Sequence, residues 1–141
     1  FRNVKFIKSD IFKYKPDKKF DYILLDVPCS GLGTLSSKAD LRWTKSENDI
    51  KMLSKLQFRM LEKASGWLSA NGYLVYSTCT IENDEIEDVV SEFLSKHPEF
   101  QLENGNSSFI EPFNTTRGVY RSWAHKHGIG GGGFVRIRRK D

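Results

Sequence analysis

The chain has 141 residues, of which 38% are hydrophobic, 28% charged and 13% aromatic. This length favours one domain, whose core buries roughly two-thirds of the surface that the unfolded chain exposes. No apolar stretch approaches the roughly 18 residues that a membrane-spanning helix needs, so we expect no membrane partner. The net charge of +4 is uneven, because Pro112 to Lys140 contains no acid. This basic stretch favours nucleic acid as a partner, although a solvated charged face accounts for it equally well.

Only two cysteines, Cys29 and Cys79, are present. Two cysteines are far from the disulfide framework of a small secreted domain, so we expect a reducing, cytoplasmic location. A single structural disulfide or two inert buried thiols is the alternative interpretation of this pair. The chain begins Phe1-Arg2-Asn3-Val4, with neither an initiator methionine nor a signal-peptide pattern, and we therefore expect a fragment of a longer polypeptide.

Apolar runs predict three strands in the first part of the chain. Val4–Lys8 leads to Asp10, and the more apolar run Phe20–Asp26 itself ends on an aspartate. Tyr73–Ser77 is the third strand. Polar residues thus follow each predicted strand, where ligands bind in an open α/β sheet.

Helical spacing of apolar residues predicts two helices between and after these strands. The first starts near Ser46, because Asp49 stands three residues later as in a capping box, and it continues through Leu68 until Asn71-Gly72 stops it. The second covers about Glu82 to Lys96 and closes before a proline. Alternating strands and helices predict right-handed crossovers and a mostly parallel sheet with helices on its faces.

The last third has a different pattern. Phe100–Leu102, Val119–Trp123 and Phe134–Ile137 are predicted to be short strands. The glycine-rich run from Gly128 to Gly133 joins the last two, which predicts an antiparallel hairpin on the edge of the sheet. A phosphate-binding loop is disfavoured, because no helix follows the glycines.

Both cysteines emerge directly after a predicted buried strand. A thiol attacks only as a thiolate, and a free cysteine with a pKa near ~8.5 is mostly protonated at neutral pH. Cys79 precedes a predicted helix, whose N-terminus, together with hydrogen bonds from Thr78 and Thr80, is expected to stabilise its thiolate. Cys29 follows Pro28 in a loop and lacks such help, so the two thiols are expected to differ in role.

Four motifs together resemble one family. Asp26-Val27-Pro28-Cys29-Ser30-Gly31, Asp40-Leu41-Arg42-Trp43, Ser77-Thr78-Cys79-Thr80 and the stretch from Arg121 to Gly128 resemble the NOL1/NOP2/Sun (Fmu, RsmB-like) RNA cytosine-5 methyltransferases. The resemblance implies a Rossmann-like class I methyltransferase sheet, S-adenosylmethionine as cofactor, and tRNA or rRNA as substrate. It also implies that Cys79 attacks C6 of cytosine and that Cys29 assists elimination and product release.

Further site residues are implied by the same resemblance. Asp10 and Pro28 are assigned to the cofactor, and Asp26 to both the cofactor and the target base. The alternative for Asp10 is a simple turn cap. Residues expected to contact RNA are Lys38, Arg42, Trp43, Arg121, His125 and Lys126. Trp43 has a core position as its alternative. Because C6 of a stacked cytosine is inaccessible to a thiol, the target base must be single-stranded or flipped out.

The chain lacks some features of the family. No glycine-rich cofactor loop precedes Val4–Lys8, so we expect residues 1–141 to be the carboxy-terminal part of a single catalytic domain whose first strands are absent. Such a chain is expected to be inactive without the amino-terminal half, and a separate polypeptide that supplies this half is the alternative to excision from a longer chain. A non-catalytic RNA-binding or scaffold module with the same fold is the main alternative. No metal is expected, because the cysteine spacing is unlike that of zinc sites.

Overall fold

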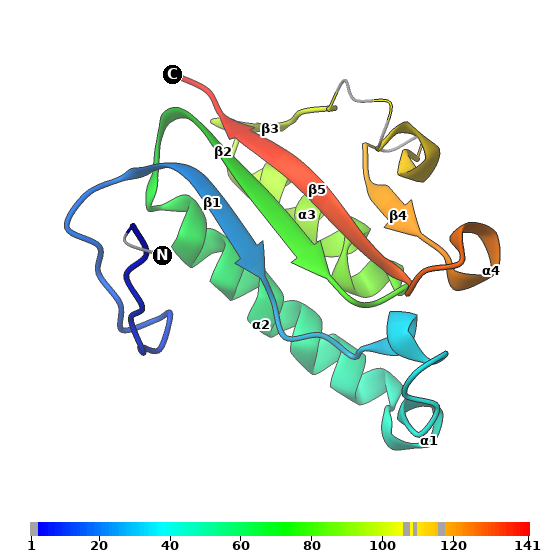
Figure 1. Ribbon diagram of the computed structural model, residues 1–141. Coiled ribbons are helices and arrows are strands. Elements are labelled where there is room, and N and C mark those ends of the chain that lie inside the picture. Colours follow the sequence, from blue (N-terminus) through cyan, green and yellow to red (C-terminus); the bar gives the residue numbers. More distant parts are fainter. Residues whose placement is uncertain (1–2, 106–107, 109, 116–117) are drawn as a thin grey trace.

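The computed structural model describes residues 3–105, 108, 110–115 and 118–141. In these residues one sheet holds all the strands, in the order β1-β2-β5-β3, with β4 also paired to β5 (Figure 1). The strands are β1 (Phe20–Asp26), β2 (Leu68–Thr78), β3 (Phe100–Leu102), β4 (Tyr120–Ser122) and β5 (Gly132–Arg139). β1 and β2 run parallel, whereas β5 is antiparallel to β2, β3 and β4. The predicted antiparallel pairing of the last two strands is therefore confirmed, but β5 lies inside the sheet and not on its edge.

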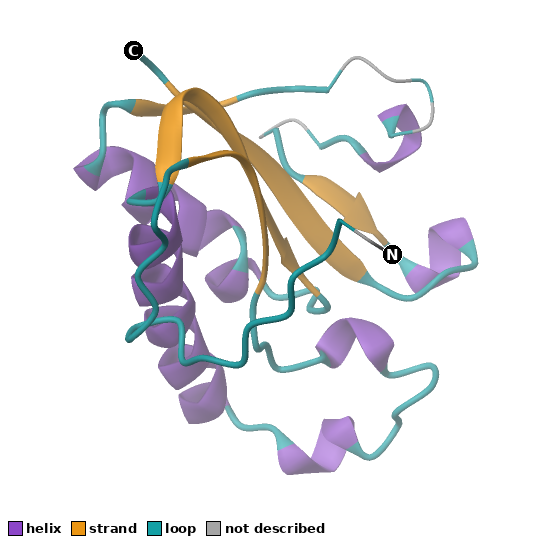
Figure 2. Cartoon of the chain, turned by 60° about the vertical axis from the view of Figure 1, so that its left-hand side comes forward, coloured by secondary structure: helices purple, strands orange, loops and turns teal. Residues whose placement is uncertain are grey.

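Helices α2 (Glu47–Ser65) and α3 (Glu87–Lys96) cover one face of this sheet (Figures 1 and 2). The core lies between them and the inward-facing residues of β1, β2 and β5, among them the fully buried Leu74, Tyr76 and Val135. Two short helices, α1 (Leu41–Thr44) and α4 (Ala124–His127), lie near the carboxyl ends of β1 and β2 (Figure 1). No helix among the described residues has the length and apolar character needed to cross a membrane.

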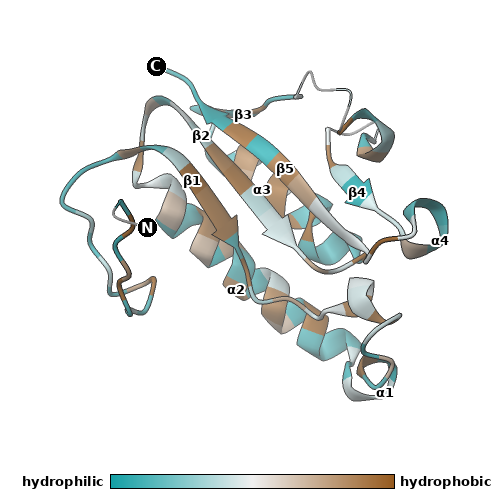
Figure 3. Ribbon diagram, in the orientation of Figure 1, coloured by the Kyte–Doolittle hydropathy of each residue, from teal (hydrophilic) through white to brown (hydrophobic). Residues whose placement is uncertain are grey.

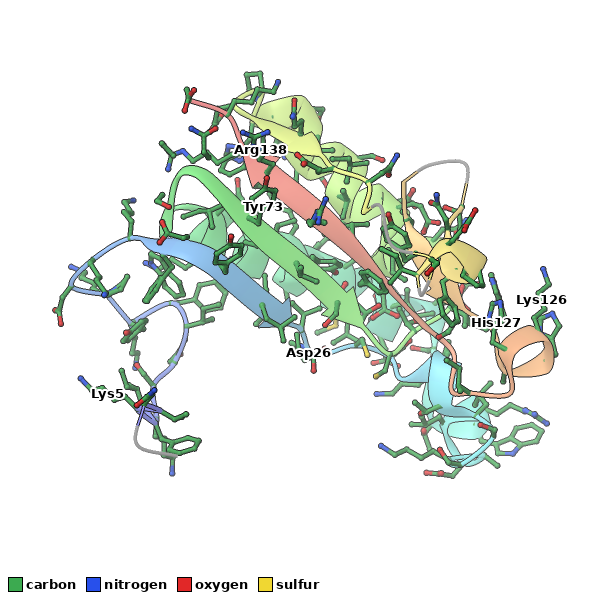
Figure 4. All side chains as sticks on the ribbon, turned by 45° about the horizontal axis from the view of Figure 1, so that its top comes forward. Lys5, Asp26, Tyr73, Lys126, His127 and Arg138 are labelled. Atoms are coloured by element: carbon green, nitrogen blue, oxygen red, sulfur yellow. The ribbon has the colours of Figure 1, made fainter. Side chains whose placement is uncertain are left out.

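The opposite face of the sheet carries no helix in the described chain. Tyr22 and Leu24 of β1 are 77% and 73% exposed, and apolar residues run along this strand (Figure 3). Tyr22 stacks on Tyr73 with ring centroids 5.9 Å apart, and the Arg138 guanidinium lies 5.8 Å from the Tyr73 ring centroid (Figure 4). The period of two along β1 thus separates a helix-covered face from a bare one.

The capping box that was predicted to start the long helix is present. The Ser46 side chain accepts the Asp49 N–H, and the Asp49 side chain accepts the Ser46 N–H at 2.9 Å. The predicted stop at Asn71-Gly72 is wrong, because α2 ends at Ser65 and these two residues lie inside β2. Leu68 instead pairs with β1, and an irregular register there is accommodated by Asn71 at a φ of 61°.

Two other element predictions need correction. The helix predicted from Glu82 is interrupted, since a 3-10 helix (Asn83–Glu85) comes first and Ile86 has non-helical φ and ψ. Val4–Lys8 forms no strand in the described chain, and Val4 and Phe6 are 52% and 93% exposed. A strand is stable only beside a hydrogen-bonded neighbour, and among the described residues β1 pairs with β2 alone.

Candidate active site at the two cysteine loops

The parallel pairing of β1 and β2 brings the two cysteine loops together. Asp26 and Ser77 stand opposite each other at the strand ends, and Cys29 and Cys79 follow a few residues later. Their Sγ atoms lie 2.7 Å apart, both as free thiols, and the Cys79 N–H donates to Cys29 Sγ at 3.3 Å. A separation of fifty residues in sequence is thereby closed at the carboxyl edge of the sheet, where α/β proteins bind ligands.

The two thiols have different surroundings. Cys79 is exposed, whereas Cys29 is partly buried. Burial, followed by the side-chain hydrogen bond with Cys79, raises the pKa of the Cys29 thiol to about 12. Cys29 therefore remains protonated at neutral pH and is the S–H donor of the pair whenever Cys79 is a thiolate.

The predicted activation of Cys79 by a helix N-terminus does not fit the structure. α3 begins only at Glu87, and the Thr80 hydroxyl is 2.9 Å from Ser30 Oγ and accepts the Glu82 N–H. The Cys79 thiol contacts the Cys29 thiol. Its environment is thus set by the second cysteine loop and not by a helix end.

The glycine-rich loop from Gly128 to Gly133 packs against both cysteine loops, which the sequence did not predict. The Gly33 N–H donates to the Cys79 carbonyl at 3.0 Å, and the Gly131 N–H donates to the Gly33 carbonyl at 2.7 Å. A Cβ atom on Gly33 would lie 2.1 Å from the Gly131 carbonyl oxygen. Only a glycine at position 33 allows this close approach. The spacing of the glycines in the sequence did not reveal this role.

The candidate cofactor residues divide into two places. Asp26 is exposed at the end of β1 beside the cysteine loops, and its Oδ1 accepts the Ser77 hydroxyl at 2.8 Å (Figure 4). Pro28 is also exposed, and its carbonyl is held by Gln57. Asp10 is exposed in the irregular amino-terminal segment, where its Oδ1 accepts the Phe12 N–H at 2.8 Å, the turn cap of the alternative interpretation.

Most of the predicted RNA-contacting residues are exposed near the same end of the sheet. Lys38, Arg42 and Trp43 lie in and before α1, and the 84% exposure of Trp43 rules out its core alternative. His125 and Lys126 are exposed on α4, which follows β4 (Figures 1 and 4). These residues from α1 and α4 flank the region where β1 and β2 end.

Arg121 does not fit its predicted role as an RNA contact. Its side chain is only 4% exposed, and Nε donates to Glu87 Oε1 at 2.9 Å within a bidentate ion pair. The remaining donors reach the Ile81 carbonyl and Asn83 Oδ1, both at 2.9 Å. The basic run near the carboxyl end thus contains a buried structural arginine, which the count of charges did not distinguish.

Beneath the cysteine loops lies a buried acidic group that sequence reasoning also missed. Glu85 is fully buried and receives hydrogen bonds from Ser30 and Gln57. No short-range spacing reveals it, because these partners are 55 and 28 residues away. In the sequence it is one acid among several in the stretch from Glu82 to Glu87.

Comparison with known proteins gives one family. Over residues 1–134 the chain matches the family described as 16S rRNA methyltransferase RsmB/F. It is 33% identical over 128 residues to a Bacillus subtilis (strain 168) protein named probable ribosomal RNA small subunit methyltransferase B, covering 88% of this chain and 28% of that protein. It is 41% identical over 86 residues to ribosomal RNA small subunit methyltransferase B of Yersinia pseudotuberculosis (serotype O:1b, strain IP 31758), covering 61% and 20%.

Solved structures have the same fold. The crystal structure of NSun6 from Pyrococcus horikoshii with SFG aligns with a TM-score of 0.84 and 29% identity, covering 99% of this chain and 35% of that one. A methyltransferase homolog protein from the same organism gives 0.68 and 30%, covering 87% and 40%. The predicted Rossmann-like α/β class is thus confirmed. The chain spans about a quarter of the length of the curated relatives it matches.

Proposed function

The chain belongs to the 16S rRNA methyltransferase RsmB/F family, and from this premise we propose that it is the carboxy-terminal part of an S-adenosylmethionine-dependent RNA cytosine-C5 methyltransferase. The observation that carries the proposal is the pair of free thiols 2.7 Å apart at the ends of adjacent parallel strands. One thiol is exposed and the other is kept protonated, which is the division of roles that the family resemblance assigns to Cys79 and Cys29.

Cys79 is the nucleophile in this proposal. Its thiolate sulfur forms a bond to C6 of the cytosine ring, and the electron pair of the C5=C6 double bond moves to C5. C5 becomes a carbon nucleophile by this addition, which splits one difficult substitution into easier steps. Exposure of Cys79 at the loop end leaves room for a flipped-out or single-stranded base.

Cys29 and Asp26 handle protons and hydrogen bonds around that ring. Release of the product requires that a water molecule take up the proton from C5, after which the C5–H electron pair re-forms the double bond and the C6–S bond breaks with its electron pair on Cys79 Sγ. Cys29 lies against Cys79 Sγ and donates its S–H to that sulfur as it leaves as a thiolate. Asp26, oriented by Ser77, accepts hydrogen bonds from the exocyclic amine of the base or from the cofactor.

The exposed carboxylates fit the proposed cofactor. Asp26 and Asp10 are acceptors for the amino and hydroxyl groups of S-adenosylmethionine. Pro28 lies beside Asp26 at the carboxyl edge of the sheet. When bound, this cofactor would supply an electrophilic methyl group to C5, and S-adenosylhomocysteine would be the leaving group. RNA, either tRNA or rRNA, is bound by the exposed residues in and near α1 and α4. We expect the protein to act in the cytoplasm, where these RNAs are modified.

A hybrid protein tests the proposal. In it, this chain replaces the matching segment of the Bacillus subtilis relative, and small-subunit ribosomal RNA from cells that lack the relative is the substrate. We expect 5-methylcytidine by mass spectrometry from the hybrid, and at least a ~1,000-fold loss in its Cys79→Ser variant. The 141-residue chain alone is expected to be inactive.

Two controls make the result decisive. The intact relative must be active, and circular dichroism melting must show that the hybrid is folded. A folded hybrid that binds RNA but forms no 5-methylcytidine would support the alternative of a non-catalytic RNA-binding or scaffold module. Methylation that survives Cys79→Ser would contradict the covalent mechanism.

A further inference from the structure

Glu85 accepts three hydrogen bonds in the interior below the cysteine loops. Oε1 accepts the Ser30 N–H at 2.9 Å and the Gln57 side-chain amide at 2.8 Å, and Oε2 accepts the Ser30 hydroxyl at 2.5 Å. Glu85 is fully buried, and no cation forms an ion pair with it among the described residues. A buried carboxylate is costly, and here only hydrogen-bond donors offset the cost.

The direction of the hydrogen bonds in this network is determined by its donors. The Ser30 hydroxyl donates to Glu85, so the Thr80 hydroxyl donates to Ser30 Oγ, at 2.9 Å. Burial, followed by the negative charge on Glu85, raises the pKa of Tyr76, whose hydroxyl therefore stays protonated and donates to the Glu85 carbonyl at 2.7 Å. The Glu85 side chain thus accepts from Ser30 and Gln57, and its backbone carbonyl accepts from Tyr76.

The same network holds the chain on both sides of Cys29. Gln57 donates to the Pro28 carbonyl at 2.8 Å as well as to Glu85, so the residues before and after Cys29 are connected to one carboxylate. Thr80 connects the residue after Cys79 to Ser30. The residues next to Cys29 and Cys79 are thus connected by hydrogen bonds to Glu85. The 2.7 Å distance between the two sulfurs depends on these connections.

We propose that Glu85 is a positioning residue that sets the separation and orientation of the Cys29 and Cys79 thiols. It acts through Ser30, Gln57 and Thr80 and does not touch the substrate. The inference rests on the proposed function, in which both thiols act on one base. A displacement of reacting groups by about 1 Å can cost about 100-fold in rate, so a carboxylate remote from the substrate is able to control the chemistry.

The first test measures the thiol geometry without catalysis. Dibromobimane, a short reagent that fluoresces when it links two thiols, is added to the folded 141-residue chain. We expect the linking rate to fall at least ~10-fold in Glu85→Ala and to be largely retained in Glu85→Gln. The glutamine oxygen still accepts from Ser30 N–H and Gln57, and its amide nitrogen donates to Ser30 Oγ once that hydroxyl rotates.

The second test measures turnover in the hybrid protein. Glu85→Ala is expected to lower kcat about 100-fold with KM for RNA changed less than about threefold, and Glu85→Gln to restore most of that kcat. The matched control is Glu87→Ala, which removes another buried carboxylate two residues away whose side-chain hydrogen bonds, among the described residues, go to Arg121. It is expected to lower the melting temperature without changing the bimane linking rate.

Each outcome decides the inference. If Glu85→Ala lowers the melting temperature but leaves linking and kcat within twofold, Glu85 is only structural and the inference is overturned. If Glu85→Ala does not fold, Ser30→Ala gives the same decision, because it removes one bond to Glu85 and the bond to Thr80. If linking depends on Glu85 while the folded hybrid is inactive, the positioning role stands and the proposed function fails.

Discussion

Two buried glutamates from one short segment support two different regions of the molecule. The cysteine cluster consists of Cys29, Ser30, Cys79, Thr80 and Glu85, and the hairpin cluster consists of Ile81, Asn83, Glu87 and Arg121. In the hairpin cluster a cation neutralises the acid and fastens β4 to α3. In the cysteine cluster Ser30 of the Cys29 loop and Gln57 of α2 donate to an acid that has no cation partner among the described residues.

The two clusters separate residues that stabilise the fold from residues that position the reacting groups. An ion pair between a helix and a strand fixes elements that packing already brings together. Hydrogen bonds from loops to a buried carboxylate fix atoms that packing alone does not place, because loops bury little apolar surface. The hairpin cluster therefore determines how much of the chain is folded, and the cysteine cluster determines where two sulfurs lie.

The largest stability effect is expected in the hairpin cluster. Glu87→Ala leaves the Arg121 guanidinium buried without its partner, and loss of one member of a buried pair costs about 3–5 kcal/mol. Urea unfolding followed by circular dichroism measures the change. A loss below about 1 kcal/mol would mean that solvent reaches Arg121 easily, and the contrast between the two clusters would disappear.

A smaller effect is expected where the glycine loops meet the cysteine cluster. Gly33→Ala forces a Cβ against the Gly131 carbonyl oxygen and the Cys79 carbonyl oxygen, so we expect about 1–3 kcal/mol of destabilisation and slower bimane linking. Gly130→Ala is the matched control, because nothing lies within 4 Å of its added Cβ, and it should stay within about 0.5 kcal/mol of the parent. Equal effects of the two variants would refute the close contact.

The last effect concerns pH, is absent at neutral pH, and is specific to Cys29. The folded pKa of Cys29 is raised from 9.0 to about 12, so the folded chain keeps this proton between these values while the unfolded chain loses it. The stabilisation is complete below pH 9 and is lost as the pH rises toward 12. Brief iodoacetamide pulses with peptide mass spectrometry should show Cys29 alkylation rising near pH 9 in urea and near pH 12 in the folded chain. Identical profiles would contradict this.

Local signals in the sequence predicted part of the fold well. The bounds of Phe20–Asp26 were predicted residue for residue, because an apolar run between polar residues has a clear pattern, although the strand is exposed on one face and not buried as expected. The Ser46–Asp49 capping box marked the start of α2. The strand at Val4–Lys8 was wrong because pairing depends on a neighbour that no local pattern supplies. The end of α2 was misplaced because Leu68 suits a helix face and a strand equally.

The candidate site was predicted where it depends on strand ends and missed where it depends on distant partners. Cys29 and Cys79 were identified because each follows an apolar strand, and parallel pairing then brings them together. Arg121 was counted with the surface cations because its partner is 34 residues away in sequence. The buried position of Glu85 was not predicted for the same reason, because its partner Ser30 is 55 residues away.

Covalent capture tests the central claim most directly. The hybrid protein is incubated with S-adenosylmethionine and RNA containing 5-fluorocytosine, whose C5 has no proton to release, and the adduct is digested and mapped by mass spectrometry. We predict a methylated nucleotide bonded to the peptide that contains Cys79, absent in Cys79→Ser and present in Cys29→Ser. An adduct on Cys29, or none from a folded hybrid that binds RNA, would contradict the assignment of Cys79 as the nucleophile.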